Sequence, residues 1–274
     1  MEPTIYFVIP CYNEEAVLPE TTRRLAEKLQ AMQSAGLIGK DSRVLYVDDG
    51  SKDKTWQLIS QFHQEYPWVE GVKLAHNRGH QNALLCGLMT AKDRCDAAIS
   101  MDADLQDDID ALDQFVTKFR EGCDVVYGVR NKRDTDTWFK RTTAEGFYKV
   151  MQLLGVDVVF NHADYRLMSK RALEALSEYK EVNLFLRGIV PLIGYRSDTV
   201  YYDRHERFAG ESKYPLKKMI SFALDGITSF SVKPLKLISN LGILISVLSI
   251  LGLLYALISY FAGWAVTGWT AIVC

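Results

Sequence analysis

The fold is decided by an apolar run that ends in two aspartates, Ala97-Ala98-Ile99-Ser100-Met101-Asp102-Ala103-Asp104-Leu105-Gln106. Its apolar part, residues 97–101, predicts a short buried β-strand. Side chains of a strand alternate between its faces, so Asp102 and Asp104 can point the same way, with Gln106 next in line. Two carboxylates and an amide oxygen suit a hard cation such as Mg²⁺ or Mn²⁺, which would bridge a diphosphate. We therefore predict a metal site at the end of this strand.

Helix capping is the competing explanation for the acidic stretch. Asp107, Asp108 and Asp110 lie at the start of a predicted helix, Ile109–Arg120, where carboxylates stabilise the first turn. We expect Asp107 and Asp108 to act as caps. Capping does not require carboxylates back at the strand end, so metal binding is the favoured role of Asp102 and Asp104.

The sequence on either side alternates strand-like and helix-like patterns, which predicts an α/β domain with a largely parallel sheet. The predicted strands are Thr4–Ile9, Arg43–Val47, Val69–Leu74, Ala97–Met101 and Asp124–Gly128. The other predicted helices are Glu15–Gln33, Lys54–Glu65 and Gln81–Lys92. Polar clusters follow four of the strands, at residues 11–14, 48–51, 77–80 and 102–104. Ligands of such sheets bind at the carboxyl ends of the strands, so we expect these clusters to form one site.

The second of these clusters, Asp48-Asp49-Gly50-Ser51, is suited to a nucleoside. An aspartate at a strand end can accept a hydrogen bond from a base N–H or from a ribose hydroxyl. Alternatively, Asp-Gly forms a common turn, and Asp53 has the position of a helix N-cap. Neither a GxxxxGK[ST] phosphate loop nor a GxGxxG turn occurs in the sequence, so side chains and a metal would have to bind a nucleotide.

Composition narrows the class of protein. A net charge of −2 over 274 residues gives no broad basic field, which argues against nucleic-acid binding. The five cysteines have neither CxxC nor zinc-type spacing, so we expect free thiols in a reducing compartment. No basic segment followed by an apolar one opens the sequence, and we expect no signal peptide and a body in the cytosol.

The C-terminal part predicts membrane attachment. Residues 237–274 contain no Asp, Glu, Lys or Arg, which allows one complete span and the beginning of an unfinished second span near Gly263–Trp264. Lysines just before it, at 213, 217, 218, 233 and 236, predict that this side is cytoplasmic. Residues 212–231 alternate basic and apolar positions, as in a surface helix. We expect a catalytic domain over 1–210, a juxtamembrane amphipathic helix over 211–236, and a transmembrane segment over 237–274.

Taken together, the motifs resemble those of the inverting glycosyltransferases of family two, which have the GT-A (Rossmann-like) fold. The resemblance rests on residues 10–14, 47–53, 77–79 and 102–106. Residues 164–168, residues 207–214 and the apolar tail make it similar to the polyprenyl-phosphate group, which includes bactoprenol glucosyltransferases and dolichyl-phosphate mannose synthases. The region from about 134 to 210, with a predicted helix at Thr142–Leu154, would be an acceptor-side extension.

The resemblance implies a role for each matching residue. The nucleoside pocket would include Pro10, Tyr12, Glu14, and Asp48 or Asp49. Asp102, Asp104 and Gln106 would hold Mg²⁺ or Mn²⁺ on the diphosphate. Asp164 would lie near the sugar and the acceptor and, with Asp104, form the catalytic pair. Arg130, Arg207 and Lys213 would face phosphates, although a solvated loop or plain membrane attraction also explains these cations.

The expected reaction is an inverting transfer of a hexose from UDP-glucose or UDP-N-acetylglucosamine to undecaprenyl phosphate. It would take place at the cytosolic face of the cytoplasmic (inner) membrane, and a homo-oligomer is compatible with it. The alternatives are a GDP-mannose-dependent mannosyltransferase and a non-catalytic, membrane-tethered nucleotide-sugar-binding protein. A processive synthase is disfavoured because no Arg-Trp dipeptide occurs.

Two expectations about individual side chains remain open. A phosphate monoester is already largely anionic at neutral pH, so Asp164 need not act as a strong base and could position the acceptor. Its alternative role is a salt bridge to Arg166 or a cap. His76, His80 and His162 lie near motifs, and we expect them to be structural or peripheral.

Overall fold

The computed structural model describes residues 2–131, 162–180, 186–203 and 233–263. Its strands are β1 (Ile5–Cys11), β2 (Arg43–Asp48), β3 (Val69–Lys73), β4 (Ala97–Ser100), β5 (Val125–Arg130), β6 (His162–Ser169) and β7 (Ser197–Tyr202). They form one seven-stranded sheet in the order β3-β2-β1-β4-β6-β5-β7. β6 is antiparallel to both of its neighbours, and the other pairs are parallel. The prediction of a mostly parallel sheet is confirmed.

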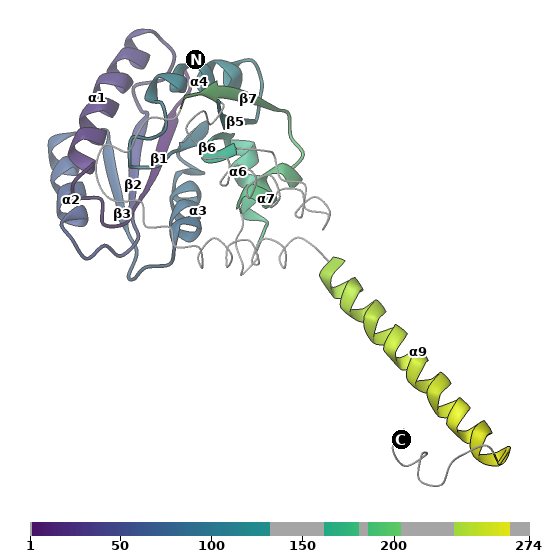
Figure 1. The fold of residues 1–274 in the computed structure, drawn as a ribbon. Coiled ribbons are helices and arrows are strands. Elements are labelled where there is room, and N and C mark those ends of the chain that lie inside the picture. The colour runs from purple at the N-terminus through teal and green to yellow at the C-terminus, as the bar shows by residue number, and fades with distance from the viewer. Residues whose placement is uncertain (1, 132–161, 181–185, 204–232, 264–274) are drawn as a thin grey trace.

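Helices cover both faces of the sheet (Figure 1). They are α1 (Leu18–Ser34), α2 (Thr55–Glu65), α3 (His80–Ala91), the 3₁₀ turn η1 (Ile109–Ala111), α4 (Leu112–Arg120), α6 (Lys170–Ser177) and α7 (Leu186–Leu192). One further helix of the described ranges, α9 (Lys233–Phe261), projects away from the sheet. Alternation along β1 divides the core: Ile5, Phe7 and Ile9 pack with α1, α2 and α4, whereas Tyr6 and Val8 pack with α3, α6 and α7. Side chains two apart share a face of a strand, so β1 is buried on both sides.

The five predicted strands are all present, with ends that differ by up to two residues. α1 begins at Leu18 rather than Glu15, with a proline in its first turn, a position that proline favours. The region from about 134 to 210, expected as an acceptor-side extension, differs more. It supplies β6, which lies between β4 and β5, and the edge strand β7. The predicted helix at 142–154 lies outside the described residues.

The order of the strands places a topological switch point between β1 and β4, where open α/β sheets have their ligand-binding crevice. The chain runs from β1 outward to β2 and β3, and then returns to place β4 on the other side of β1. The segments that follow β1 and β4 therefore diverge at the carboxyl edge, the usual place for a ligand in such sheets. The antiparallel β6 brings its first residues to this same edge, and β5 and β7 end there.

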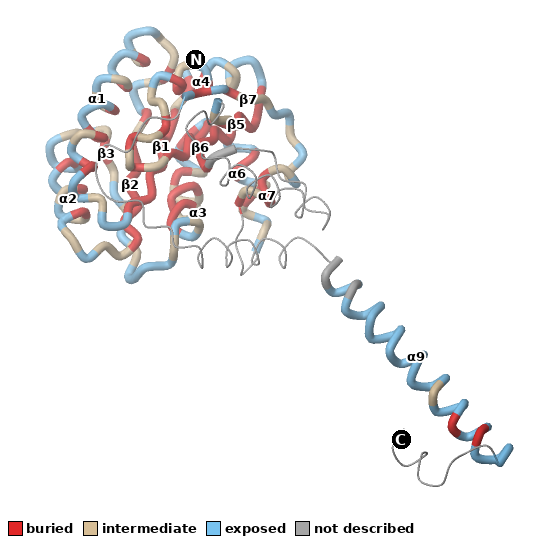
Figure 2. Tube along the Cα trace, viewed as in Figure 1, coloured by how far each residue is buried: buried red, intermediate tan, exposed pale blue. Residues whose placement is uncertain are grey.

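The C-terminal helix α9 matches the predicted apolar tail. Residues Ile238–Phe261 have a mean hydropathy of 2.6 and are long enough to cross a bilayer. Most of their side chains are exposed (Figure 2). Much of the predicted juxtamembrane segment, and the start of a second span, lie outside the described residues.

Candidate active site

The loops after β1 and β2 are joined by hydrogen bonds into one unit. The Asp49 N–H donates to the Cys11 carbonyl over 2.9 Å, and the Asn13 N–H donates to Ser51 Oγ over 3.0 Å. In return, Asn13 Oδ1 accepts from the Lys52 N–H at 2.9 Å. Asn13 has a φ of 56°, a left-handed conformation that asparagine tolerates better than most residues. These bonds fix the backbone around the predicted nucleoside residues.

Asp48 and Asp49 occupy different environments, although the sequence left their roles open. Both oxygens of Asp49 are used, by the Arg78 N–H at 2.6 Å and the Gly79 N–H at 2.9 Å. Asp49 therefore fixes the loop that leads into α3. Asp48 is fully buried and accepts from the Ser51 N–H at 3.1 Å, but its Oδ2 has no hydrogen-bond partner. A buried carboxylate oxygen in this state has capacity for a donor from a ligand.

The other predicted nucleoside residues differ in exposure. Pro10 is buried within β1, whereas Tyr12, just after the end of this strand, is 42% exposed. Glu14 is half-buried, and its N–H donates to Thr55 Oγ1 over 2.9 Å. Of these three, Tyr12 has the most side-chain surface available for contact with a ligand.

The acidic segment, residues 102–110 after β4, contains a strained turn. Leu105 is buried and has a φ of 59°, an uncommon conformation for a bulky residue that costs on the order of 1–2 kcal/mol. Next to it, Asp104 Oδ1 accepts from the Gln106 N–H at 3.1 Å. Thr21 Oγ1 donates to the Ala103 carbonyl over 2.7 Å and ties the segment to α1. Strain of this kind is concentrated at functional sites.

Asp107 was predicted to cap a helix, and this prediction is wrong. Its side chain is buried, and its Oδ1 accepts a 2.6 Å hydrogen bond from the Tyr202 hydroxyl. Burial, reinforced by the charge of Asp102, raises the pKa of Asp107 to about 6. Asp108 does cap, since its carboxylate accepts from the Asp110 N–H at 2.9 Å. The two residues differ because Asp107 is buried and Asp108 is not, a difference that the sequence pattern does not reveal.

The acidic segment fits a divalent cation in its charge. Asp102 and Asp104 both raise the pKa of Asp107, and Asp107 Oδ2 is buried without a hydrogen-bond partner. A cation at Asp102, Asp104 and Gln106 would offset this concentration of negative charge. Within the described ranges, no three His, Cys, Asp or Glu side chains are arranged to hold a metal. The remaining ligands would therefore have to come from Gln106 and from a bound diphosphate.

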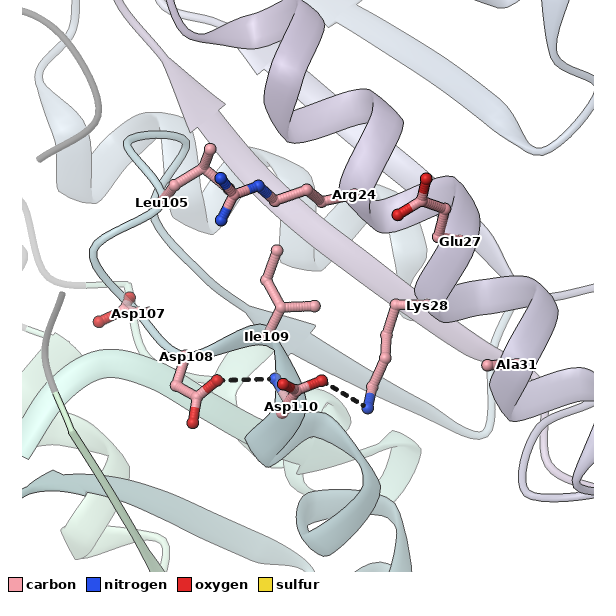
Figure 3. A pocket seen from close by; sticks show the side chains of 9 residues that line it. All are labelled: Arg24, Glu27, Lys28, Ala31, Leu105, Asp107, Asp108, Ile109 and Asp110. Atoms are coloured by element: carbon pink, nitrogen blue, oxygen red, sulfur yellow. Dashed lines mark hydrogen bonds and ion pairs between the residues drawn. The ribbon is translucent and has the colours of Figure 1, made fainter.

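A hollow of about 400 Å³ lies between α1 and residues 105–110, and its lining includes the neighbours of Asp104 and Gln106 but neither residue itself (Figure 3). Its lining includes Arg24, Lys28 and Asp110, and Lys28 Nζ lies 3.3 Å from Asp110 Oδ1. The carboxylate of Asp107 points away from α1 in this view. None of the predicted site residues that the structure describes lines this hollow, so the carboxyl edge of the sheet remains the candidate site.

Asp164 is the centre of a charged cluster. Arg187 donates to both of its oxygens, Nε to Oδ1 and Nη2 to Oδ2, each over 3.1 Å. Gln81 Nε2 donates to Oδ2 over 3.4 Å. Burial alone would raise the pKa of Asp164, but Arg187 and His80 outweigh it and hold that pKa well below its usual range. A carboxylate with so low a pKa is a poor proton acceptor. The contacts of Asp164 with Arg187 and His80 instead favour a role in anchoring these two side chains.

His80 was expected to be peripheral, but it lies between two predicted site residues. Its Nε2 is 3.5 Å from Asp164 Oδ2 and 3.8 Å from Asp102 Oδ1. Burial opposes its charge, yet the hydrogen bond to Asp164 and the charge of Asp102 raise the pKa of His80 to about 9. Because 41% of the side chain is exposed, solvent screens part of this attraction. Its place directly after the Asn77-Arg78-Gly79 cluster was the available signal.

The cation that pairs with Asp164 was not predicted from the sequence. Arg166 was named as its alternative partner, whereas Arg187 belongs to no motif. The expected alternative, a salt bridge between Asp164 and Arg166, is not formed. The Arg166 guanidinium lies over the Tyr127 ring, 5.4 Å from its centre, and its Nε and Nη2 have no hydrogen-bond partner. Arg187 comes from α7 instead, so a helix that packs back on the sheet supplies the cation.

Arg130 lies at the end of β5, beside the acidic segment. Its Nε donates to the Tyr202 hydroxyl over 3.3 Å, and its Nη2 is 3.8 Å from Asp107 Oδ1. Arg207 and Lys213 lie outside the described residues. Of the predicted site residues that are described, Asp102 and Asp164 are linked through His80, and Arg130 contacts the acidic segment.

The family model described as glycosyl transferase family 2 matches residues 6–177. The chain belongs to glycosyltransferase family 2. The family match covers the strands and loops that form the crevice, including Asp102, Asp104 and Asp164.

Three family relatives give the range of similarity. The uncharacterized glycosyltransferase YkoT of Bacillus subtilis (strain 168) is 53% identical over 99% of this chain and 81% of its own length. The prophage bactoprenol glucosyl transferase homolog of Escherichia coli (strain K12) is 35% identical over 98% of this chain and 86% of its own. The bactoprenol glucosyl transferase of Shigella phage SfV is 36% identical over 90% and 78%.

Solved structures show the same fold at lower identity. The mannosyltransferase PcManGT from Pyrobaculum calidifontis, in complex with GDP-Man and Mn²⁺, has a TM-score of 0.55 and 19% identity, over 77% of this chain and 59% of that one. Staphylococcus aureus TarS 1–349 in complex with UDP-GlcNAc has a TM-score of 0.52 and 16% identity, over 82% and 65%. The α/β body therefore has the GT-A-like arrangement.

Proposed function

We propose that this glycosyltransferase moves a hexose from UDP-glucose or UDP-N-acetylglucosamine to a polyprenyl phosphate, with inversion at the anomeric carbon. The observation that carries the proposal is the meeting of Asp102, His80 and Asp164 at the carboxyl edge, in a chain that also has an apolar helix of spanning length. Relatives named bactoprenol glucosyl transferase, 35–36% identical over at least 90% of this chain, favour the same acceptor.

The nucleotide would occupy the side of the crevice formed by the β1 and β2 loops. Tyr12 offers an exposed ring to the base, and the unpartnered Asp48 Oδ2 can accept a hydrogen bond from the nucleoside. Pro10 and Glu14 would shape the same pocket, while Asp49 holds the neighbouring loop through two backbone hydrogen bonds. A pocket fixed by backbone hydrogen bonds suits a rigid ligand such as a nucleoside.

Asp102, Asp104 and Gln106 would hold Mg²⁺ or Mn²⁺ against the diphosphate. When bound, the cation neutralises the negative charge that develops on the departing nucleotide. The chain's own contribution is to fix these oxygens. The hydrogen bonds from Thr21 Oγ1 to the Ala103 carbonyl and from the Gln106 N–H to Asp104 Oδ1 offset the cost of the strained turn at Leu105 and position the segment.

The acceptor would approach the opposite side, where Asp164 holds Arg187 and His80. A phosphate monoester is largely anionic at neutral pH, with its second pKa near ~6, and does not need a strong base. We propose that Asp164 holds the two cations in position and lies near the sugar, while the phosphate oxygen attacks the anomeric carbon directly. This single displacement leads to inversion.

The membrane part of the proposal follows from the acceptor. Residues 1–210 would form the cytosolic catalytic domain, residues 211–236 a juxtamembrane helix, and residues 237–274 the membrane segment in the cytoplasmic membrane. Arg207 and Lys213 would join Arg130 in binding phosphate groups near the membrane. If so, Arg207→Ala and Lys213→Ala should each lower transfer by about thirty- to a hundredfold and stay in the membrane fraction. Lys217→Ala is the matched control and should have little effect.

A donor screen with the full chain in membranes tests the proposal. Undecaprenyl phosphate is supplied with radiolabelled UDP-glucose, UDP-N-acetylglucosamine or GDP-mannose in the presence of Mg²⁺ or Mn²⁺, and label is counted in the lipid extract. We expect label from a UDP-sugar, its loss in excess chelator, and an inverted anomeric configuration by NMR.

Each other result identifies a rival. Label from GDP-mannose alone would make the chain a mannosyltransferase. Binding of a nucleotide-sugar without transfer to any polyprenyl phosphate would indicate a tethered binding protein. Transfer at the full rate in chelator would refute the metal assignment, and a retained configuration would refute direct displacement.

A further inference from the structure

A buried tyrosine hydroxyl separates a cation from a carboxylate at the end of the sheet. Tyr202, the last residue of β7, donates to Asp107 Oδ1 over 2.6 Å and accepts from Arg130 Nε over 3.3 Å. Arg130 Nη2 and Asp107 Oδ1 are 3.8 Å apart. The three side chains come from β5, β7 and the acidic segment, and none of them is adjacent to another in sequence.

The spacing within this group is wide for an arginine and a carboxylate. Such pairs normally close to about 2.7–2.9 Å, frequently with two parallel hydrogen bonds. Here the short hydrogen bond to Asp107 comes from Tyr202, and the guanidinium contacts the hydroxyl. The hydroxyl thus acts as a spacer, because it occupies Oδ1 of Asp107, the oxygen nearest to Arg130, and lies between that oxygen and the guanidinium.

The position of the hydroxyl is itself fixed. Tyr202 is 2% exposed, and its ring packs edge-on against Tyr165 with 5.2 Å between centres. The Tyr165 hydroxyl donates to the Asp108 carbonyl over 2.9 Å. Both tyrosines therefore contact the acidic segment, one at the Asp107 side chain and one at the backbone of the next residue. The Tyr202 hydroxyl is thus held by the packing of its ring on Tyr165 and by its hydrogen bond to Asp107, independently of the Arg130 guanidinium.

We propose that Tyr202 is a positioning residue that holds the Arg130 guanidinium away from Asp107 and directed toward a phosphate group in the crevice. This inference rests on the proposed function. Arg130 lies beside the segment that contains Asp102 and Asp104, where both phosphate-bearing substrates would meet. The phosphate belongs either to the donor's diphosphate or to the polyprenyl phosphate, and a kinetic test distinguishes the two.

The test compares two single-atom deletions on the same strand. Tyr202→Phe removes the hydroxyl and keeps the ring that packs on Tyr165. Tyr201→Phe removes a hydroxyl from a neighbouring side chain that is 62% exposed, and it is the matched control. KM for the UDP-sugar, KM for undecaprenyl phosphate, kcat and the unfolding temperature are measured for both variants and the unmodified chain.

We expect Tyr202→Phe to raise one KM about tenfold, the loss of about one hydrogen bond to a charged group, while kcat changes less than twofold. A rise confined to undecaprenyl phosphate identifies the acceptor phosphate, and a rise confined to the UDP-sugar identifies the diphosphate. Tyr201→Phe should match the unmodified chain. A change in kcat alone, equal changes in both variants, or no change in Tyr202→Phe would overturn the proposal.

A second substitution separates positioning from simple loss of packing. In the Tyr202→Phe background, Asp107→Asn removes the charge that would attract Arg130, so part of the lost affinity should return relative to Tyr202→Phe alone. A structural role predicts further loss instead, because the second change also disturbs the buried segment. If the unmodified chain transfers no sugar, the proposed function fails. If it transfers sugar but the Asp107→Asn change restores nothing, only this inference fails.

Discussion

The two sides of the crevice are built differently. On the side of the β1, β2 and β3 loops, the contacts are hydrogen bonds from backbone N–H groups to side-chain oxygens, as at Ser51, Asn13 and Asp49. On the side of β4 and β6, the contacts join charged side chains, with Asp164 between Arg187 and His80. The first side is therefore held together by hydrogen bonds to the backbone, and the second by ion pairs between side chains.

This difference separates what each side can do. The geometry of loops joined by backbone hydrogen bonds depends little on nearby charges. Such loops suit recognition of a neutral base and ribose. A cluster of paired charges is strongly destabilised when one charge is removed, because the remaining charges are left without a partner. We therefore assign donor recognition to the first side and the transfer step to the second, and the following predictions test that division.

The largest effect is expected for Asp104→Ala on the charged side. Transfer should fall by about a thousandfold, the equivalent of roughly 4 kcal/mol, because the departing diphosphate loses its charge neutralisation. Initial rates of lipid-linked product formation measure it, with thermal unfolding as a check on folding. Asp110→Ala, at a side chain that is 90% exposed on the same segment, is the control. Similar rates for the two variants would refute the assignment of Asp104 to the metal.

Asp164→Asn should have the next largest effect. Removing one charge from a buried pair costs about 3 kcal/mol of unfolding free energy, and kcat should fall about a hundredfold because Arg187 and His80 lose their anchor. Urea unfolding and single-turnover kinetics measure the two. The same substitution at Asp198, which is half-exposed and paired with Lys118, should cost under about 1 kcal/mol. An unfolding midpoint of Asp164→Asn equal to that of Asp198→Asn would contradict the anchoring role.

Asp49→Asn probes the other side with the same chemistry. Its two oxygens accept from the Arg78 and Gly79 N–H groups, and an amide can accept only with its oxygen. We expect KM for the UDP-sugar to rise about tenfold from the displaced loop, with kcat and the acceptor KM nearly unchanged. Steady-state kinetics with each substrate varied in turn measure this. A fall in kcat as large as that of Asp164→Asn would abolish the distinction between the two sides.

The last prediction concerns stability rather than transfer, at Gly50, where the β2 and β3 loops approach each other. Its φ is 69°, and an added Cβ would lie 2.7 Å from the backbone N of Asn77. Gly50→Ala should cost about 3 kcal/mol of stability, from the torsion and the clash together. Gly36→Ala, at a φ of 65° with only a flexible glutamate oxygen at 3.4 Å, should cost about 1 kcal/mol. Equal unfolding temperatures would show that the two loops are not held tightly together.

The same division explains what the sequence could predict. Asp48 ends β2 and Asp49 follows it, and Asp102 and Asp104 come just after β4, so the alternation of strand-like and helix-like patterns was enough to locate them. Asp164 was found only through its resemblance to a family motif. Arg187 and Tyr202 were missed, because their partners are 23 and 95 positions away in the chain and β6 and β7 were not predicted as strands. Asp107 was misassigned because a cap and a buried carboxylate have the same sequence pattern before a helix. The roles of the site residues themselves stay predictions until the variants are measured.

The central claim is that the two sides have separate jobs, and nucleotide binding tests it most directly. Calorimetric titration of UDP in Mg²⁺ needs no acceptor and no turnover, so it isolates the donor side. We predict that Asp49→Asn weakens UDP binding about tenfold, while Asp164→Asn binds UDP within about twofold of the unmodified chain although it barely transfers sugar. Equal weakening by both substitutions, or weakening by Asp164→Asn alone, would contradict the account.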